Sequence, residues 1–421
     1  MSDSFLCRRS GNRDNGYVTI NFESGASHVE HSVPTPLSEA RIALAATEVG
    51  DYALFGGGEV NNSPYHSSTV DAYNESLTRT TPTSLSEGRN ALAATTVGDY
   101  ALFGGGHSGS ALTNVVDAYN LSLTRSTPTS LSEARRALAA TTVGNYALFG
   151  GGWSGFGYSQ TIDAYNSNLV RSTPTSLSEG RQDLASTSVE GYDANYALFG
   201  GGRHNSTGDY YSYSTVDAYN TSLTRSTPTS LSQARGCLAA TSVRTYYVKL
   251  TPIGTWIYEY YALFAGGYTD DNYFVYPTVD AYNKSLTRST PTPLSESRYY
   301  LSAARVGNLA LFGGGYGNSY SSTVDAYDEN FVRYTASNLS EGRELLSAAT
   351  VGNYALFGGG YVGSGFSSTV DAYTINSKVQ VYPGTIYKFN DMQNEQTSST
   401  FQELTLKTPI SGYMKIYNET N

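Results

Sequence analysis

The sequence predicts an all-β fold, a seven-bladed β-propeller of four-stranded antiparallel blades. A Leu-Phe pair recurs with steps of 48, 46, 50, 65, 48 and 45 residues, its phenylalanines being Phe55, Phe103, Phe149, Phe199, Phe264, Phe312 and Phe357. With few departures, each copy reads L-S-E-x-R-x-x-L-A-A-T-x-V-G-[DN]-Y-A-L-F-G-G-G, then a variable stretch, then S-T-V-D-A-Y-N-x-S-L-T-R-S-T-P-T. A repeat of this length indicates a propeller or a solenoid.

Four short strands follow from the template. LAATTV and YALF are apolar runs joined by Gly-Asn or Gly-Asp, which is typical of a tight hairpin. TVDAYN and LTRST form a second pair around an Asn-x-Ser turn, and the proline after them cannot continue a central strand. YALF is apolar on both sides, as expected of a strand buried between stacked blades, and the small residues of LAAT suit a crowded axis. These features favour the propeller over the solenoid.

The ring is expected to close with a strand from the N-terminus. SHVEHSVPTPLSEAR at 27–41 aligns with SLTRSTPTSLSEAR, which places Pro34 on Pro128. The last copy instead runs into TINSKVQVYPG after Tyr373. We therefore expect residues 28–34 to form the outer strand of the last blade. The predicted organisation is an arm over 1–27, a propeller over 28–376 with repeats starting near 37, 85, 131, 177, 231, 294 and 339, and a small β segment over 377–421 for attachment or oligomerisation.

The composition of the chain excludes several classes of partner and site. Charged residues make up 15% of the chain and the net charge is -10, so no basic footprint for nucleic acid or an anionic membrane is present. The two cysteines, Cys7 and Cys237, predict neither a disulfide framework nor a Cys/His metal site. No signal-like or membrane-spanning apolar run occurs, so we expect synthesis in the cytoplasm and no membrane insertion.

The stretches between the glycine triplet and the Asp-Ala-Tyr strand differ in all seven copies, and propeller geometry places them on one face. They are rich in Tyr, Ser, Gly and Asn, a composition that suits protein contacts and sugars. The alternative is a merely tolerant surface. The predicted ligand-binding residues are Tyr65, His66, His107, Trp153, Phe156, Tyr158, Arg203, His204, Tyr210, Tyr211, Tyr213, Tyr268, Asp270, Asp271, Tyr273, Phe274, Tyr316, Tyr320, Tyr361 and Phe366.

The fifth copy carries an insertion, RTYYVKLTPIGTWIYEYY, between Val243 and Ala262. It joins the first two strands of its blade, so it is expected on the face opposite the variable loops. It is either a hairpin that packs on the body or a docking element, and we favour docking. Its candidate contact residues are Tyr246, Tyr247, Trp256, Tyr258 and Tyr260.

Charged residues shared by every copy are expected to be structural, because a catalytic site would break the repeat symmetry. They are expected to form salt bridges between blades or to cap strand ends. They comprise Arg41, Arg89, Arg135, Arg181, Arg235, Arg298 and Arg343 with Asp71, Asp117, Asp163, Asp217, Asp280, Asp325 and Asp371. Catalytic carboxylates would have to come from Glu59, Asp209, Asp270 and Asp271, with no positive support. We expect no enzyme activity, no metal and no cofactor.

The apolar strand ending in Gly-Gly, paired with a downstream Val-x-x-Tyr strand at a period near 50, resembles the kelch-repeat propellers over about 28–374. The tryptophan of the fourth strand is replaced by leucines such as Leu77 and Leu123, so the version is divergent. The resemblance implies a binding platform, although galactose oxidase is an enzymatic relative.

The ends, FLCRRSGN and VYPGTIYKFNDMQNEQ with FQELTLKTPISGYMKIYN, look like pieces of phage tail or fibre proteins. We therefore expect a virion protein, held by its termini to other virion or assembly proteins, whose variable-loop face recognises a host surface glycan or protein. Assembly into a homo-oligomer is a further option. The alternatives are a decoration or assembly protein that contacts only virion proteins, or a bacterial kelch-type interaction protein of the cytoplasm.

Overall fold

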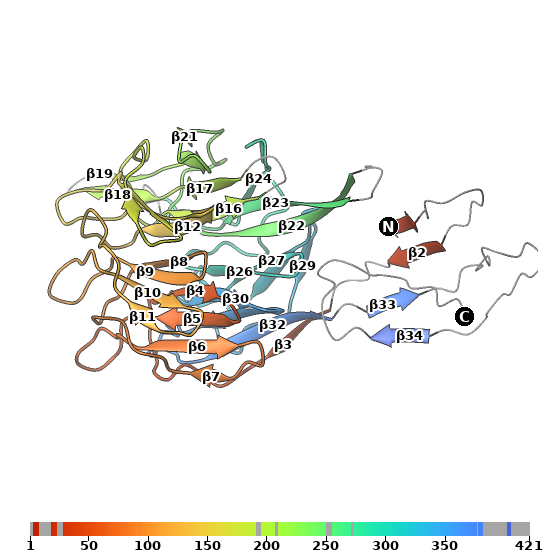
Figure 1. The fold of residues 1–421 in the computed structure, drawn as a ribbon, viewed down its shortest axis with the longest axis horizontal. Helices are drawn as coiled ribbons and strands as arrows, with labels where there is room; N and C mark the ends of the chain where they lie inside the picture. Colours follow the sequence, from red (N-terminus) through yellow and green to blue (C-terminus); the bar gives the residue numbers. More distant parts are fainter. Residues whose placement is uncertain are drawn as a thin grey trace, which may run out of the picture. The chain divides into compact units, whose positions relative to one another are not determined.

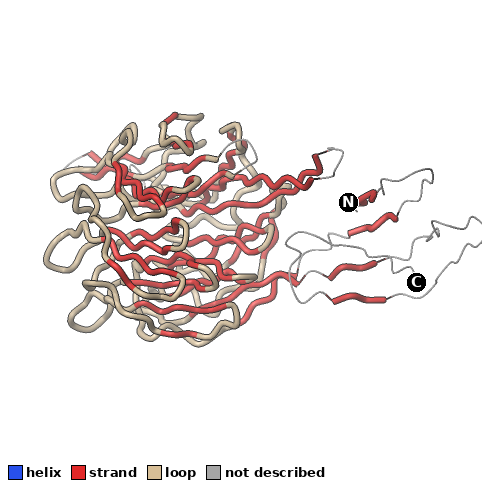
Figure 2. Tube along the Cα trace, in the orientation of Figure 1, coloured by secondary structure: helices blue, strands red, loops and turns tan. Residues whose placement is uncertain are grey.

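The computed structural model describes residues 3–7, 18–22, 28–190, 195–206, 209–249, 255–270, 273–376, 378–381 and 402–405. Within these ranges every regular element is a β-strand (Figures 1 and 2). None of the described residues forms a helix that could span a bilayer. The chain divides into two compact units, His31–Thr374 and a smaller one made of Met1–Glu30 with Ile375–Asn421.

The larger unit is a seven-bladed β-propeller of four-stranded blades. Six blades are continuous in sequence. The first is β4 (Ala45–Val49), β5 (Tyr52–Gly56), β6 (Val70–Asn74) and β7 (Arg79–Thr80); the second is β8 (Ala93–Val97), β9 (Tyr100–Gly104), β10 (Val116–Asn120) and β11 (Arg125–Ser126); the third is β12 (Ala139–Val143), β13 (Tyr146–Gly150), β14 (Ile162–Asn166) and β15 (Arg171–Ser172). The fourth is β16 (Ala185–Val189), β17 (Tyr196–Gly200), β20 (Val216–Asn220) and β21 (Arg225–Ser226); the fifth is β22 (Ala239–Lys249), β23 (Thr255–Ala265), β24 (Val279–Tyr282) and β25 (Arg288–Ser289); the sixth is β26 (Ser302–Val306), β27 (Leu309–Gly313), β28 (Val324–Tyr327) and β29 (Arg333–Thr335).

The seventh blade takes its outer strand from the other end of the propeller, as predicted. Its order is β3 (His28–Ser32), β32 (Val370–Asn376), β31 (Tyr354–Gly358) and β30 (Ser347–Val351). His31 Nε2 lies 2.7 Å from the Asp371 carboxylate. In the other blades an arginine of the fourth strand faces this aspartate, as Arg125 faces Asp117 at 3.0 Å. His31 therefore takes the place of that arginine in the strand that closes the ring.

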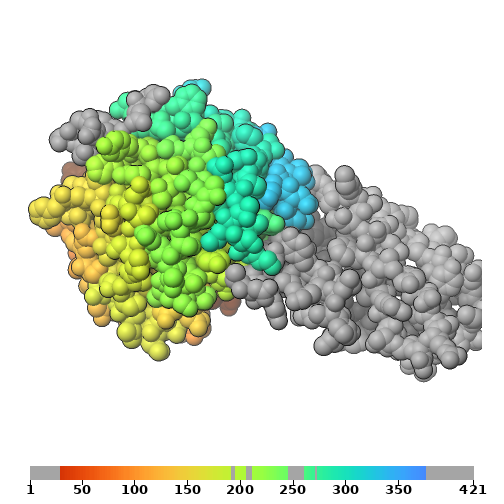
Figure 3. Space-filling view, turned by 90° about the horizontal axis from the view of Figure 1, so that it is seen from above, coloured from red at the N-terminus to blue at the C-terminus, as the bar shows by residue number. Residues whose placement is uncertain are grey.

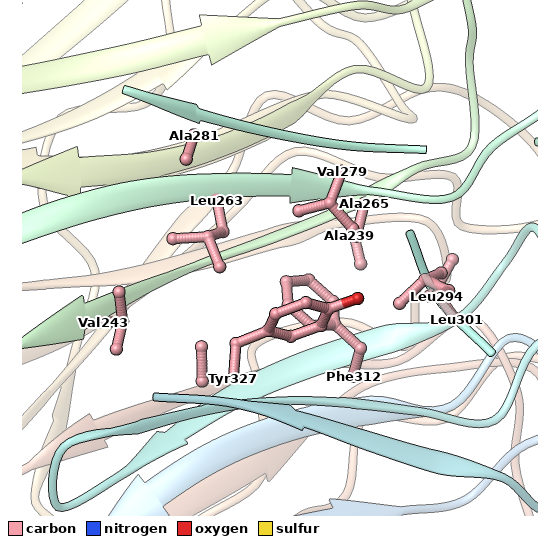
Figure 4. Packing of buried hydrophobic residues seen from close by; sticks show 11 residues of the cluster. Ala239, Val243, Leu263, Ala265, Val279, Ala281, Leu294, Leu301, Phe312 and Tyr327 are labelled. Carbon is pink, nitrogen blue, oxygen red and sulfur yellow. The ribbon is translucent and has the colours of Figure 1, made fainter. Parts of the chain in front are cut away.

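The hydrophobic core lies between consecutive blades. Phe312 and Tyr327 of one blade point toward Leu263, Val279 and Ala281 of the blade before it (Figure 4). Because both faces of the middle strands are covered, the Ala-Leu-Phe segment of β13 is fully buried, which explains its lack of polar alternation. Burying one such phenylalanine contributes about 1.5–3 kcal/mol. On the side of the propeller seen in Figure 3, neighbouring blades follow one another in sequence order, from yellow through green to blue.

The repeated arginines and aspartates are fully buried ion pairs. Arg135, in the connection before β12, places Nη2 2.9 Å from Asp163 Oδ2 on β14 and 3.1 Å from the Phe149 carbonyl oxygen. Its own carbonyl oxygen accepts a hydrogen bond of 2.9 Å from Gly106 N of the preceding blade. Burial lowers the pKa of Arg135 and outweighs the raising effect of Asp163. Each ion pair thus lies within one blade and not between blades as one of the two expectations had it. The arginine side chain caps strand-end carbonyl groups, and its main-chain carbonyl oxygen joins the preceding blade.

The glycine triplet has a backbone role. Gly150 ends β13 against the ring of Phe199 in the next blade. Gly151 and Gly152 have φ of 69° and 105°, in the region that favours glycine. Gly152 N donates to the carbonyl oxygen of Arg181 at 2.9 Å. The triplet therefore ends one strand and links its blade to the following one.

The smaller unit contains two antiparallel strand pairs among its described residues. β1 (Asp3–Cys7) pairs antiparallel with β2 (Val18–Phe22), and β33 (Lys378–Val381) pairs antiparallel with β34 (Gln402–Thr405). β33 and β34 form the small C-terminal β segment of the predicted fold class. The rest of the predicted arm over 1–27 and of the segment over 377–421 lies outside the described residues.

Candidate binding face

Two kinds of connection emerge on one face of the propeller. One is the variable loop between the second and third strands, and the other leads from the fourth strand into the first strand of the next blade. The two are joined by main-chain pairing: Arg136 pairs with Trp153, which pairs in turn with Tyr158. Corresponding bridges in the other blades join the two connections. The seven loops therefore begin from one common backbone frame.

At the centre of this face a closed ring of seven hydrogen bonds runs from blade to blade. Each N–H donates to the carbonyl oxygen of the corresponding residue in the preceding blade at 2.9–3.1 Å. All seven residues have φ between 48° and 55°. They are Ala43, Ala91, Ala137, Asp183, Cys237, Tyr300 and Leu345. A constant main-chain ring thus presents seven positions, of which three carry alanine and the other four carry Asp, Cys, Tyr and Leu.

Two further sets of seven positions surround this ring. The residues just before it are Ile42, Asn90, Arg136, Gln182, Gly236, Tyr299 and Glu344. Their main-chain partners at the starts of the variable loops are Glu59, His107, Trp153, Arg203, Tyr268, Tyr316 and Tyr361. Most of the second set were among the predicted ligand-binding residues, whereas the first set and the ring were not. The signal was present as the two variable positions in L-S-E-x-R-x-x-L.

Aromatic rings form a continuous row across the fifth, sixth and seventh blades. Tyr268 contacts Tyr299 with ring centroids 4.7 Å apart, and Tyr299 contacts Tyr316 at 5.8 Å. Tyr316 contacts Tyr320 at 5.0 Å, which contacts Tyr361 at 5.5 Å. Tyr361 ends the row on Phe366 at 6.1 Å. We call these six side chains the aromatic row.

A polar cluster around Arg203 lies at the Tyr268 end of the aromatic row. Arg203 Nε donates to Asp183 Oδ2 at 2.7 Å, and Nη1 donates to Asp270 Oδ1 at 3.3 Å and to the Tyr268 hydroxyl. Nη2 lies 3.5 Å from the Tyr300 hydroxyl oxygen. Asp270 is only 7% exposed. The Arg203 cluster joins residues of three blades and breaks the seven-fold symmetry of the face.

Cys237 lies at the base of the Arg203 cluster. It is a buried free thiol, and burial raises its pKa well above the ordinary value. The thiol is therefore neutral at neutral pH, unlike the thiolate that a nucleophilic or metal-binding cysteine requires. Among the residues that the structure describes, no group of three or more His, Cys, Asp or Glu side chains could hold a metal ion.

The remaining part of the face carries histidines and separate aromatic contacts. The His66 and His107 rings are 5.6 Å apart, and the Arg136 guanidinium lies 5.0 Å from the centre of the Trp153 ring. Burial lowers the pKa of His107, and Arg136 and His66 add to this effect. His204 contacts Tyr158 at 4.2 Å and Tyr211 at 5.7 Å.

Several predicted ligand-binding side chains project into solvent at the loop tips. The Phe156 side chain is fully exposed, and the exposed fractions of Tyr273 and Tyr65 are 76% and 57%. Phe274 and Tyr211 are also exposed, and Tyr213 is half-buried. Asp271 and the side chain of Tyr210 lie outside the described residues.

The predicted insertion is a long hairpin on the opposite face (Figures 1 and 2). β22 and β23 pair from Ala239↔Ala265 to Lys249↔Thr255. Near its base, Tyr260 N donates to the Glu190 carbonyl oxygen at 2.8 Å, and Tyr261 makes an edge contact with Phe331 at 5.0 Å. Neighbouring blades therefore brace the base of the hairpin. The side chains of Tyr246, Tyr247, Trp256 and Tyr258 lie outside the described residues.

Comparisons with known proteins support the fold alone. No family model matches the chain, and no curated protein matches it significantly. Among solved structures, the one titled "Structure of YjhT" is similar with a TM-score of 0.51 and 11% sequence identity, covering 73% of this chain and all of that one. At this identity the likeness confirms the β-propeller and carries no information on ligands.

Proposed function

We propose that the protein is a non-enzymatic binding module that uses the variable-loop face to recognise a surface carbohydrate or a protein. One observation carries the proposal: the same main-chain pairing presents different side chains in seven equivalent places on one face. A fold under structural constraint alone would leave those positions without a common chemical character. Here five of the seven positions at the starts of the loops carry a Tyr, Trp or His, namely His107, Trp153, Tyr268, Tyr316 and Tyr361.

The chemistry of the face fits such a ligand. Aromatic side chains supply large contact area with few rotatable bonds, and the Ser, Asn and Gly residues of the loops supply adaptable hydrogen bonding. Among the loop residues that the structure describes, five aromatic side chains are exposed, namely Tyr65, Phe156, Tyr211, Tyr273 and Phe274. Binding platforms of this kind are what the resemblance to kelch-type propellers implies.

We further propose that the protein belongs to a phage virion and is attached through its terminal segments. The support is the resemblance of FLCRRSGN and VYPGTIYKFNDMQNEQ to the ends of tail or fibre proteins. In this arrangement the propeller presents its variable-loop face to the host cell. Immunogold labelling of purified particles tests this step, and absence of the protein from particles would contradict it.

The binding proposal is tested by two multiple variants. In the first, Trp153, Tyr211, Tyr316 and Tyr361 of the variable-loop face are replaced by Ala. In the second, Val170 and Val332, which are exposed at turns on the opposite face, are replaced by Ala as a matched control. The first variant should lose binding to host cells while keeping its thermal unfolding midpoint, and the second should bind normally. Normal binding by the first variant would refute the proposal.

A further inference from the structure

We infer that the aromatic row is the binding site of a linear, uncharged oligosaccharide that lies across the fifth to seventh blades. This inference rests on the proposed function and assigns the ligand class and its place on the face. Its first support is continuity, because each ring from Tyr268 to Phe366 contacts the next at 4.7–6.1 Å. This spacing is close to the length of one pyranose unit, so successive rings can meet successive sugars.

The rings are available for such contacts. Tyr299, Tyr316, Tyr320 and Tyr361 are half-buried, whereas Tyr268 is anchored at one end with 9% exposure. Interplanar angles along the row lie between 51° and 80°, so neighbouring rings are not stacked face to face. The apolar faces of sugars pack on aromatic faces, and the tyrosine hydroxyls provide polar partners beside them.

The row is also held in place before a ligand arrives. The Tyr361 hydroxyl donates to the Gly363 carbonyl oxygen at 2.9 Å, and Arg203 donates to the Tyr268 hydroxyl. Main-chain pairing fixes Tyr299 against Tyr316. Side chains that are already ordered lose little entropy on binding, which favours affinity for a ligand with many weak contacts.

The charges along the row disfavour an anionic glycan. The Glu344 carboxylate lies beside the row, where burial and then this carboxylate raise the pKa of Tyr299. The Arg203 guanidinium, which lies 5.5 Å from the centre of the Tyr268 ring, is engaged by the two carboxylates of Asp183 and Asp270. With three acidic groups and one engaged guanidinium, a uronic acid, sialic acid or phosphate would meet net repulsion. An uncharged chain of hexoses or N-acetylhexosamines meets none.

The test compares variants in the aromatic row with variants in the other half of the variable-loop face. Wild-type protein is titrated with linear glucose and N-acetylglucosamine oligomers of increasing length, and is screened on an array of neutral and acidic linear glycans. We expect affinity to rise with length for a neutral glycan. Tyr316→Ala and Tyr361→Ala should each weaken binding by about tenfold or more, as loss of an aromatic contact at a binding centre does. Tyr316→Phe should bind nearly normally.

The control is Val170→Ala with Val332→Ala at turns on the opposite face, which should leave glycan binding unchanged. Trp153→Ala and Tyr211→Ala test the other half of the variable-loop face. The inference is wrong if these two variants lose binding while Tyr316→Ala does not, or if acidic glycans bind best. It is also wrong if host-cell binding persists but no neutral linear glycan is retained. In each of these cases the proposed function survives. If no variant of the face affects binding to cells, the proposed function itself fails.

Discussion

At the scale of single residues, the buried arginine–aspartate pairs have a structural role in the fold and not a catalytic one. The guanidinium groups of the seven repeated arginines are fully buried, and each lies against a buried aspartate. Removing one member of such a pair leaves an unpaired charge in the interior, which costs far more than the pair contributes. Their presence in every blade argues for this role, because a reaction centre needs one distinctive place.

Replacing Asp163 by Asn should therefore destabilise the protein strongly. The neutral amide cannot compensate the charge of Arg135, and we expect a loss of about 3–5 kcal/mol in the free energy of unfolding. Denaturant titration measures this loss. The control is Glu133→Gln, since Glu133 is 37% exposed and lies 3.9 Å from the same arginine, and its cost should be below about 1 kcal/mol.

A paired replacement separates charge from packing. Arg135→Met combined with Asp163→Leu removes both charges, so it should recover much of the stability lost in Asp163→Asn. If the double variant is as unstable as the single one, the cost arises from lost hydrogen bonds to strand ends and not from an unpaired charge.

At the scale of elements, the three glycines of a triplet are not equivalent. The fifth blade has Ala265 where the others have the first glycine, and it is fully buried there. Gly106, the third glycine of the second blade, has φ of 113°, which side chains rarely adopt. An added Cβ would also lie 2.7 Å from the Asn90 carbonyl oxygen.

We therefore expect Gly106→Ala to cost about 1–3 kcal/mol of stability through backbone strain. Gly104→Ala is the matched comparison, because its added Cβ would meet the edge of the Phe149 ring at 2.9 Å and the backbone conformation is ordinary. Its cost should be smaller. Denaturant unfolding of both variants under the same conditions measures the two losses of stability. Equal losses would show that packing, and not the positive φ, makes glycine necessary at these positions.

The closing strand offers a second test at this scale. His31 hydrogen-bonds Asp371 where the other blades use an arginine, so His31→Ala should lower stability by about 1–3 kcal/mol. His31→Arg restores the residue of the other blades and should preserve stability. Differential scanning calorimetry compares the three proteins. An unchanged midpoint for His31→Ala would mean that β3 contributes little to closing the ring through this contact.

At the scale of the whole molecule, the seven fully buried tyrosines on the third strands of the blades predict a sharp loss of stability in alkali. Tyr165 is fully buried, its hydroxyl donates to the Thr129 carbonyl oxygen at 2.7 Å, and burial raises its pKa. The same holds for Tyr73, Tyr119, Tyr219, Tyr282, Tyr327 and Tyr373. Above about pH 10 the unfolded chain releases protons that the folded chain retains, so unfolding becomes more favourable.

The unfolding midpoint should accordingly be level between neutral pH and the ordinary tyrosine pKa, and then fall steeply as pH rises toward the raised values of the folded state. Absorbance of tyrosinate followed during the same titration should increase together with unfolding for these seven residues. Ionisation of the buried tyrosines without unfolding would contradict the assignment.

The repeats made the architecture predictable, including the strand exchanged between the ends of the propeller. The face was predictable only in part. Its variable loops are visible because they interrupt a constant template, but the ring through Cys237 and Tyr300 lies within that template. Contacts such as Arg203 with Tyr300 join residues 97 positions apart in sequence, and only the circular arrangement of blades brings them together. The exposed side chains at the loop tips, by contrast, lie in segments whose turn-rich composition already indicated surface loops.

The central claim is that the variable-loop face is the binding surface. Hydroxyl-radical footprinting of the intact protein, with and without a host-envelope preparation, tests it without choosing a site in advance. We predict protection at 153–158, 203–213, 268–276, 316–320 and 361–366, strongest along the aromatic row. Protection confined to the hairpin over 244–261 or to the terminal segments would contradict the claim and move the binding surface to another part of the molecule.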